Sequence, residues 1–391
     1  MELVHALSFP ARPTRSPQHS PGHRTLGRKP AAMADVSTNA ALAPLRLDPV
    51  LTPAIWGGEA LVRRYGKSGD PNARIGESWE CWEGSRVADG PLSGSTLSSL
   101  RTTFGARLMG HLDADRVFPI LTKFIDARDW LSVQVHPTDA YAQRVERQPF
   151  GKTECWFVLH AEPNAEIVLG WTRDTSRDEY ERRVADGTLG ELLRRVPVRS
   201  GDAFYLPSGT LHAIGPGIVV YETQQTSDLT YRIFDWNRLG SDGKPRELHV
   251  AKAADVLDYR AGTTGALKTI VYAWQGCSRT ALISDSNFTV ERFELANGAT
   301  TTLLTEGLPA IFTALADTVE IAHSGGSLRL APYQSALIPA ELDPVSLSST
   351  DTTAFLCIVP TIPGWLAERV HLAGTLDATI ADFLAQFSPA T

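Results

Sequence analysis

From Leu45 onward the chain alternates short apolar runs with turn residues, and this pattern constrains the fold more than any other feature of the sequence. Aromatic and β-branched residues are frequent in the runs, as is typical of strands. The clearest runs lie at residues 131–136, 155–159, 203–206 and 218–222, and a second series lies at 269–274, 288–295, 327–331 and 354–359. Many short strands separated by turns predict a mostly β protein built from sandwiches or barrels.

Helical patterns are fewer, and they lie at residues 96–109, at 137–148 and, as a pair, between 175 and 196. In that pair, Ser176 with Glu179 and Thr188 with Glu191 are each spaced as a capping box. In such a box a hydroxyl and a carboxylate satisfy backbone N–H groups at the start of a helix. We therefore expect two short helices that bridge two strands.

The first 44 residues differ in composition from the rest of the chain. They hold prolines among Ser, His and Arg, without hydrophobic periodicity. Such a segment cannot bury enough apolar surface to fold, so residues 1–44 are expected to form a disordered tail. The basic, acid-poor stretch before Met33 also has the composition of an organelle transit peptide. The alternatives are a dispensable tail, or an upstream start with Met33 as the true first residue.

Length and charge narrow the class of protein. With 391 residues, of which 43% are hydrophobic, the chain can form two or three domains with apolar cores. A net charge of −7 argues against a general nucleic-acid binder, because phosphate backbones are held by a surplus of Lys and Arg. The four cysteines form no CxxC pair, and no apolar run is long enough to span a bilayer. We expect a soluble cytoplasmic protein with no membrane or nucleic-acid partner.

Gln134 and His136 alternate with Val133 and Val135 along one predicted strand. Because strand side chains alternate between faces, the polar pair shares one face and the valines share the other. Taken alone, a QxH pair most often faces solvent on a half-exposed strand.

Lys152 and Glu154 lie two positions apart where residues 151–159 run into a strongly apolar strand. They project to the same side if the strand begins there. Taken alone, such a pair is usually a solvated rim pair that contributes little to stability.

Residues 201–212 combine a strand, a Pro-x-Gly turn and His212 at the start of the next strand. Pro207 fixes the backbone at the turn and Gly209 supplies a dihedral that other residues rarely adopt, so the hairpin aims His212 reproducibly. The spacing G-x5-P-x-G-x2-H is similar to the second signature of cupins, which are small double-stranded β-helix barrels. The QxH pair and the later Glu154 resemble the first signature, although 17 residues separate His136 from Glu154.

Several motifs in order closely resemble class I mannose-6-phosphate isomerase in its short bacterial form. They are IWGG (55–58), GESWE (76–80), KFIDA (123–127), QVHP (134–137), GKTECW (151–156), PSGTLHAI (207–214) and ETQQTSDLTYR (222–232). The resemblance covers about residues 45–359. It implies two cupin-type β-barrels with a few short helices: a metal-binding catalytic domain at 45–265 with a short helical insertion, and a metal-free second domain at 266–391 with a C-terminal helix.

The resemblance implies one divalent ion held by Gln134, His136, Glu154 and His212. Two imidazoles, a carboxylate and an amide oxygen suit a borderline cation, with Zn²⁺ the leading choice and other first-row metals able to compete. The implied reaction is the reversible isomerisation of mannose 6-phosphate to fructose 6-phosphate. A metal that polarises the carbonyl and hydroxyl oxygens would stabilise the enediolate formed between C1 and C2.

Lys152 is the predicted base, because a lysine close to a cation and partly desolvated can be neutral for part of the time near pH 7; its other possible role is phosphate binding. The resemblance makes Arg232 the second catalytic residue, since its forked donors fit a phosphate or a developing oxyanion. The alternative for Arg232 is a salt bridge with Asp228 or Asp235. Weaker candidates for lining the sugar-phosphate pocket are Lys123, Ser132 and Glu222, and Glu222 could equally be a buried group that orients a ligand histidine.

Two other functions are compatible with the same motifs. A cupin oxygenase would use two His and one carboxylate to hold Fe(II), but Gln134, Lys152 and Arg232 argue against it. A non-catalytic sugar-binding cupin would keep the ligands without the acid–base group. The expected assembly is a monomer or a small homo-oligomer.

Overall fold

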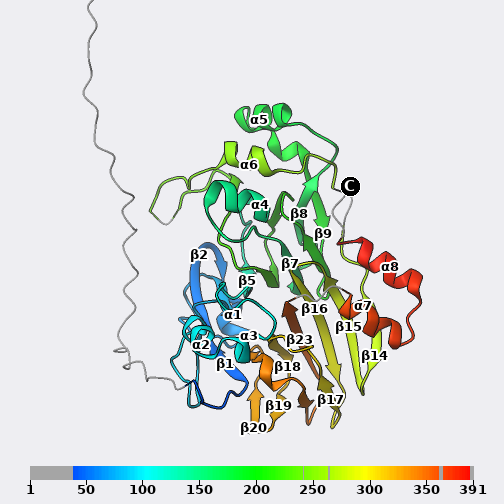
Figure 1. Ribbon diagram of the computed structural model, residues 1–391. Helices are drawn as coiled ribbons and strands as arrows, with labels where there is room; N and C mark the ends of the chain where they lie inside the picture. The colour runs from blue at the N-terminus through cyan, green and yellow to red at the C-terminus, as the bar shows by residue number, and fades with distance from the viewer. Residues whose placement is uncertain (1–37, 241, 263–264, 361–363, 388–391) are drawn as a thin grey trace, which may run out of the picture. The chain divides into compact units, whose positions relative to one another are not determined.

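The computed structural model describes residues 38–240, 242–262, 265–360 and 364–387 (Figure 1). The expected disordered tail lies outside the described residues up to position 37 and stays a prediction there. Within the described part, Leu42 is buried in the core, and Arg107 donates hydrogen bonds to the backbone oxygens of Thr38 and Ala40. The protein is mostly β in this part of the chain, as predicted. None of the described helices has the length and apolar character needed to cross a bilayer.

The described strands form four sheets, and two of them enclose the polar residues singled out above. The first, in spatial order, contains β10 (Ala203–Leu206), β7 (Glu154–Ala161), β12 (Ile218–Gln225), β5 (Ile120–Ala127), β2 (Val50–Gly58) and β3 (Ile75–Cys81). The second contains β13 (Tyr231–Phe234), β6 (Val133–Val135), β11 (His212–Ile214), β8 (Glu166–Trp171) and β9 (Leu193–Pro197). One apolar cluster, with Trp156 and Val220 from the first sheet and Ile167 from the second, packs between them.

The other two sheets are built mainly from the later part of the chain. The larger one contains β14 (Ile270–Trp274), β15 (Cys277–Ser284), β16 (Phe288–Leu295), β23 (Thr353–Pro360), β18 (Ala310–Ala316), β21 (Ser335–Ile338), β1 (Leu45–Asp48) and β4 (Arg86–Val87). The smaller one contains β17 (Thr300–Leu303), β22 (Val345–Ser348), β19 (Val319–His323) and β20 (Gly326–Leu330). Two separate closed barrels are not shown by these sheets, and the domain boundary near residue 265 stays a prediction.

The larger sheet joins the beginning of the described chain to its end. Its strand β1 pairs with β21, with Leu45 opposite Leu337. Nearby, Lys67 Nζ lies 2.6 Å from Glu80 Oε1 and donates to the backbone oxygen of Tyr333, while Ser335 Oγ donates to the second oxygen of Glu80. Lys67 and Glu80 are both buried, so breaking their ion pair would leave an uncompensated charge in the interior. The pair therefore holds the early segment against the later strand β21.

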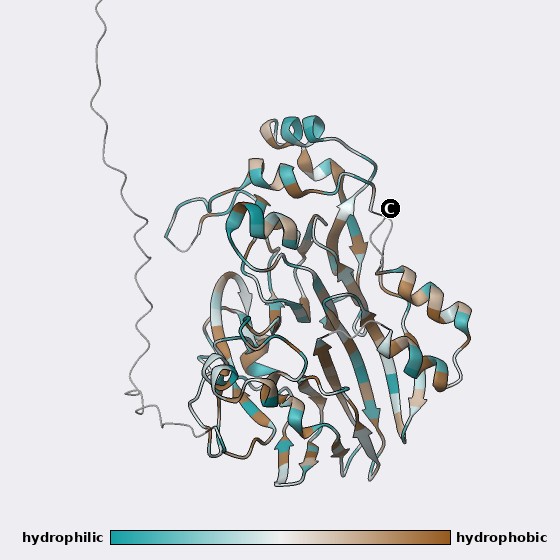
Figure 2. Ribbon diagram, viewed as in Figure 1, coloured by the Kyte–Doolittle hydropathy of each residue, from teal (hydrophilic) through white to brown (hydrophobic). Residues whose placement is uncertain are grey.

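Helices lie at the ends and outer faces of the sheets (Figure 1). They are α1 (Ala60–Arg63), α2 (Leu97–Phe104), α3 (Ala106–Met109), α4 (Asp139–Tyr141), the π-helical η1 (Ala142–Glu146), α5 (Arg177–Ala185), the 3-10 turn η2 (Leu189–Leu192), α6 (Val250–Val256), the 3-10 turn η3 (Ala340–Leu342), α7 (Trp365–Leu372) and α8 (Asp377–Ala385). An apolar cluster that holds Val133, Val135 and residues of α5 and α6 covers the outer face of the second sheet. Figure 2 shows α5 as mostly hydrophilic, in contrast to the strands.

The helix predictions are confirmed at residues 96–109 and 137–148 but only in part between 175 and 196. Ser176 caps α5, since its hydroxyl accepts from the backbone N–H of Glu179. The Glu179 carboxylate pairs with Arg173 instead of completing the box. The second predicted helix is present only as the 3-10 turn η2, which leads straight into β9, and its predicted capping box is absent, since the side chain of Thr188 makes no cap hydrogen bond.

Candidate metal centre

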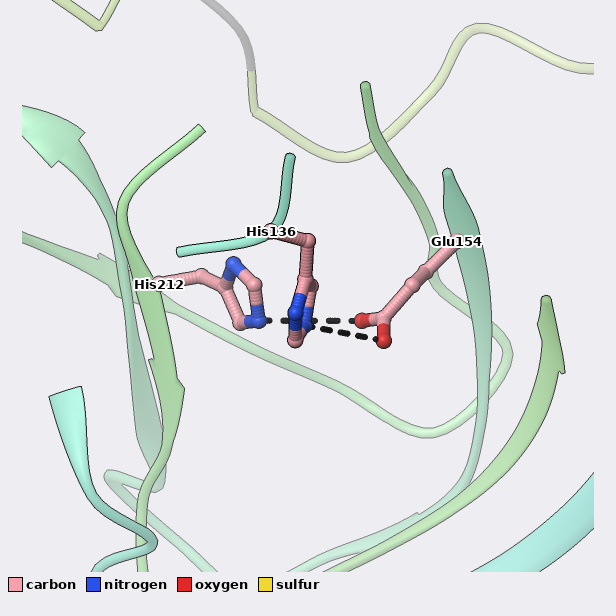
Figure 3. Close-up of side chains that lie close together, drawn as sticks. All are labelled: His136, Glu154 and His212. Carbon is pink, nitrogen blue, oxygen red and sulfur yellow. Dashed lines mark ion pairs between the residues drawn. The ribbon is translucent and has the colours of Figure 1, made fainter. Parts of the chain in front are cut away.

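Three of the four predicted ligands converge between the first and second sheets. His136 follows β6, Glu154 begins β7, and His212 begins β11. His136 Nε2 lies 3.2 Å from Glu154 Oε1, and His212 Nε2 lies 3.6 Å from Glu154 Oε2. One ligand atom from each residue lies within 4.8 Å of the others, and Figure 3 shows the three groups pointing at one another. Among the residues that the structure describes, this is the one His, Cys, Asp and Glu group placed to hold a metal ion.

The backbone around His212 explains why it reaches this point. The carbonyl of Pro207 accepts from the N–H of Thr210, and Gly209 adopts a φ of 91°, as the third residue of a type II turn requires. The N–H of Gly209 also donates to the backbone oxygen of His136. The turn is therefore tied directly to the strand that carries the other histidine, which fixes the distance between the two imidazoles.

Each imidazole is oriented by a backbone carbonyl on the far side of its ring. His136 Nδ1 lies 2.8 Å from the oxygen of Leu229, and His212 Nδ1 lies 2.8 Å from the oxygen of Thr210. Because a carbonyl can only accept, both Nδ1 atoms carry the proton and both Nε2 atoms present a lone pair to the centre. This is the arrangement that a metal-ligating histidine needs.

Three of the central atoms are buried without a partner in hydrogen-bond geometry, as expected of groups that ligate a metal ion. Neither His136 Nε2 nor either carboxylate oxygen of Glu154 has a partner in hydrogen-bond geometry among the described residues, although Lys152 Nζ lies within ion-pair distance of Glu154 Oε1. Burial, with the charge of Lys152, lowers the pKa of His136 to about 3. Burial also raises the pKa of Glu154, but neighbouring groups, first among them the charge of Lys152, outweigh it, so the pKa lies well below its usual value. Two neutral imidazoles and a carboxylate suit a divalent ion.

Gln134 is placed at the centre but with its amide turned. It lies opposite His212 in the strand pairing, and its Nε2 is 3.2 Å from His212 Nε2. The amide oxygen lies 3.5 Å from the hydroxyl of Ser132. A rotation of the terminal amide torsion, which is broad and roughly two-fold, exchanges the two atoms and presents oxygen to the centre.

A pocket of about 360 Å³ opens beside the centre, and Gln134, His212, Lys152 and Arg232 contribute to its lining. Lys152 Nζ lies 3.0 Å from Glu154 Oε1, and the side chain is buried. The structure thus places the predicted base between the pocket and the carboxylate of the centre. Ser132 lines the pocket as well.

Lys123 and Glu222 form a second charged group in the same pocket. Lys123 Nζ lies 2.9 Å from Glu77 and 3.1 Å from Glu222, and Trp156 Nε1 donates to the other oxygen of Glu222 at 2.7 Å. Burial lowers the pKa of Lys123, but the charges of Glu222 and Glu77 raise it above its usual value overall. Burial and the charge of Glu154 raise the pKa of Glu222. Lys123 therefore stays charged and suits binding, whereas Lys152 is the lysine beside the metal ligands.

Arg232 lies opposite Gln134 on β13. Its Nη1 donates to the backbone oxygen of Glu247 at 2.9 Å. The alternative salt bridge is absent among the described residues: Asp235 instead pairs with Arg246 and Arg238. The guanidinium is thus left available at the pocket.

Sequence reasoning missed several residues of this pocket, among them Glu77, Trp156 and Arg246. Glu77 stands within the GESWE motif, so its motif membership was a usable signal. Trp156 likewise ends the GKTECW motif, but its contact with Glu222 follows only from the long-range β12–β7 pairing, in which the two residues lie opposite each other. Arg246 lines the pocket from a segment without any motif, so no local signal could have found it.

The fold and the donor set define a β protein with a buried site for a divalent metal. The family model for the catalytic domain of type I phosphomannose isomerase matches residues 45–152. The mannose-6-phosphate isomerase of Streptococcus mutans serotype c is 41% identical over 260 residues, which cover 65% of this chain and 79% of that protein. The chain therefore belongs to the mannose-6-phosphate isomerase family.

Further matches agree with this assignment. Mannose-6-phosphate isomerase ManA of Bacillus subtilis is 46% identical over 219 residues, covering 55% of this chain and 68% of that protein. The crystal structure of the mannose 6-phosphate isomerase from Bacillus subtilis superimposes with a TM-score of 0.75 at 32% identity, covering 82% of this chain and 100% of that one. These matches support neither the oxygenase nor the non-catalytic alternative.

Proposed function

We propose that this protein catalyses the reversible isomerisation of mannose 6-phosphate and fructose 6-phosphate. The observation that carries the proposal is the convergence of His136, Glu154 and His212 beside a pocket that Lys152 lines, in a chain of this family. A metal centre without redox chemistry and an adjacent basic group are what a proton transfer between neighbouring carbons requires.

We further propose Zn²⁺ as the resident ion, with His136, Glu154, His212 and, after rotation of its amide, Gln134 as ligands. The donor set favours zinc over harder cations, and oriented neutral imidazoles support this choice. When bound, the ion supplies positive charge that polarises the oxygens on C1 and C2 of the sugar.

The protein's own residues handle the proton and hold the substrate. Lys152 removes the proton from C2 of the aldose and returns it to C1, while the hydroxyl proton passes from O2 to O1, so the atoms balance. Lys123 and Glu222 bind sugar hydroxyls, since a charged donor and acceptor pair lines the pocket beside the centre. Arg232 stabilises negative charge on the substrate.

We also propose that residues 45–265 and 266–391 correspond to two cupin-type barrels, of which the first binds the metal. The location of the centre between the first and second sheets supports this division. The four cysteines are free and buried, which supports function in a reducing cytoplasm.

The test is a coupled assay of fructose 6-phosphate formed from mannose 6-phosphate, with metal analysis of the same sample. Activity should disappear with a chelator and return with stoichiometric zinc. His212→Gln should lose both metal and turnover. Full activity in the chelated, metal-free protein would contradict the proposed mechanism, and no turnover by the zinc-loaded wild type would contradict the proposed substrate.

A further inference from the structure

Two arginines from different segments meet at the pocket. Arg232 comes from β13 and Arg246 from the segment that follows it, and both line the pocket beside the metal centre. Arg246 also lines a neighbouring hollow that shares Trp56 and Glu77 with the pocket. Arg246 therefore lies at the boundary between the pocket and this hollow, with part of its side chain exposed. The guanidinium of Arg232 reaches toward the same place, since it bonds to the backbone of Glu247.

Asp235 holds Arg246 in one orientation. Arg246 Nε lies 2.6 Å from Asp235 Oδ2, and Arg246 Nη2 lies 2.5 Å from Asp235 Oδ1. This two-point contact uses the Nε and Nη2 atoms on one edge of the planar guanidinium. No described residue accepts a hydrogen bond from Nη1, so this nitrogen stays available to a ligand. Asp235 is itself buried, so the pair is a fixed support and not a mobile surface contact.

At this end of the pocket Arg232 forms no ion pair with a described carboxylate; its one printed side-chain hydrogen bond goes to the backbone oxygen of Glu247. Arg238 and Arg246 both pair with the carboxylate of Asp235, and Arg238 also pairs with Asp129. Arg232 Nε is buried and has no hydrogen-bond partner among the described residues. Burial, and next the charge of Arg246, lower the pKa of Arg232. Since both guanidinium groups line one pocket, an anion bound between them would stabilise both charges.

We propose that Arg246, oriented by Asp235, forms with Arg232 the subsite for the phosphate group of the substrate. The inference rests on the proposed function for the identity of the ligand, a phosphate monoester dianion. With C1 and C2 at the metal centre, the phosphate on C6 lies at the far end of the sugar, and the part-exposed Arg246 at the boundary of the pocket is assigned to that end. Arg246 is thus a residue that selects phosphorylated over unphosphorylated sugars.

The competing explanation is structural, namely that Arg246 only pins its segment to Asp235. Arg238 provides the matched control, because it contacts the same carboxylate at 2.8 Å but does not line the pocket. If the role is structural, removing either arginine has the same effect. If Arg246 binds phosphate, only its removal weakens binding.

The experiment compares wild type with Arg246→Gln, Arg246→Lys and Arg238→Gln in the zinc-loaded full chain. A lost charged hydrogen bond should raise KM for mannose 6-phosphate, and Ki for inorganic phosphate, by about 10- to 100-fold in Arg246→Gln. Turnover at saturation should change by less than about threefold, as expected when uniform binding is lost. Arg246→Lys should give an intermediate KM, because it keeps the charge and loses the fork. Arg238→Gln should resemble wild type.

Activity on unphosphorylated mannose distinguishes a loss of phosphate binding from general damage to the active site. Its kcat/KM should be equal in wild type and Arg246→Gln. An unchanged KM for mannose 6-phosphate in Arg246→Gln, or equal defects in Arg246→Gln and Arg238→Gln, would overturn the inference while isomerisation by the wild type stands. If Arg246→Gln does not fold, as judged from its thermal melt, Arg246→Lys alone decides by its KM.

Direct binding keeps the two proposals apart. The rise in melting temperature on addition of inorganic phosphate measures binding without any need for catalysis. If the wild type does not isomerise mannose 6-phosphate, the proposed function fails. The arginine site would still be supported by phosphate stabilisation that Arg246→Gln lacks, and overturned by equal stabilisation of both proteins.

Discussion

Substituting Lys152 by Met is the sharpest test of the proposed chemistry. The side chain keeps its length and apolar stem but loses the ammonium group that lies 3.0 Å from Glu154 Oε1. A positioned base contributes about 10²- to 10⁴-fold to a proton transfer, which corresponds to about 2.7 to 5.4 kcal/mol of transition-state free energy. We expect kcat/KM for mannose 6-phosphate to fall by at least about 10²-fold.

Metal content should not fall in this variant. Lys152 is a positive charge beside the carboxylate of the centre, so its removal makes the site more attractive to a cation. A Lys152→Met protein that keeps its zinc and loses turnover has lost a chemical group and not the metal. Zinc is measured by elemental analysis of the same sample.

Exchange of the C2 proton with solvent separates a base from a binding group. Lys152→Met should lose exchange together with turnover at saturating substrate. Lys123→Met is the matched control, because Lys123 lines the same pocket but is held in its charged form by Glu77 and Glu222. Its removal leaves the buried Glu222 and the part-buried Glu77 uncompensated, which should lower stability and raise KM without abolishing exchange. Near-normal exchange and isomerisation in Lys152→Met would refute the base, and Glu222, whose pKa is raised, would be the next candidate.

The remaining predictions concern stability. In chelated protein His136 is neutral, with a pKa of about 3 against about 6.5 when unfolded. Below pH 6.5 the unfolded state therefore binds one proton more than the folded state, and the free energy of unfolding falls from there toward pH 3. In urea melts between pH 7.5 and 5, the free energy of unfolding should fall more steeply for wild type than for His136→Gln. Equal slopes would contradict this. Zinc at a hundredfold excess over its Kd should raise the free energy of unfolding by about 2.7 kcal/mol in wild type, and His212→Ala should show no such rise in the same melts. A chain that begins at Ala34 should keep full activity and melting temperature, because it retains the contacts of Arg107 with Thr38 and Ala40; a loss of either would show that the first 33 residues contribute.

The metal centre was largely predictable because its signals are local. Alternation puts Gln134 and His136 on the face opposite Val133 and Val135, and the structure buries the two valines in the outer cluster. The Pro-x-Gly turn at residues 207–209 fixes where the next strand starts, and His212 is the first residue of that strand. Neither signal depends on distant pairing, so each could be read from a few consecutive residues.

Long-range features could not be predicted in the same way. The contact of Trp156 with Glu222 depends on which residues of β7 and β12 lie opposite each other, and no turn fixes that register. The amide of Gln134 also differs from the ligand geometry, because the orientation of a terminal amide depends on its neighbours and not on its place in the strand. Arg246 is recognised as a residue of the pocket only from the folded structure, where its ion pair with Asp235 holds it at the lining.

The buried link of Lys67 with the later sheet has a consequence for the order of folding. Lys67 and its acceptor Tyr333 are 266 positions apart, and Glu80 and its donor Ser335 are 255 apart. During synthesis the strand β1 and the charged pair emerge long before their partners, so the ribosome releases most of the chain before this sheet can close. Contacts of such separation form slowly, because the chain loses the entropy of a long loop before any contact compensates for it. Closure of the larger sheet around β1 must therefore be a late step, after the strands that carry His136, Glu154 and His212 have been made.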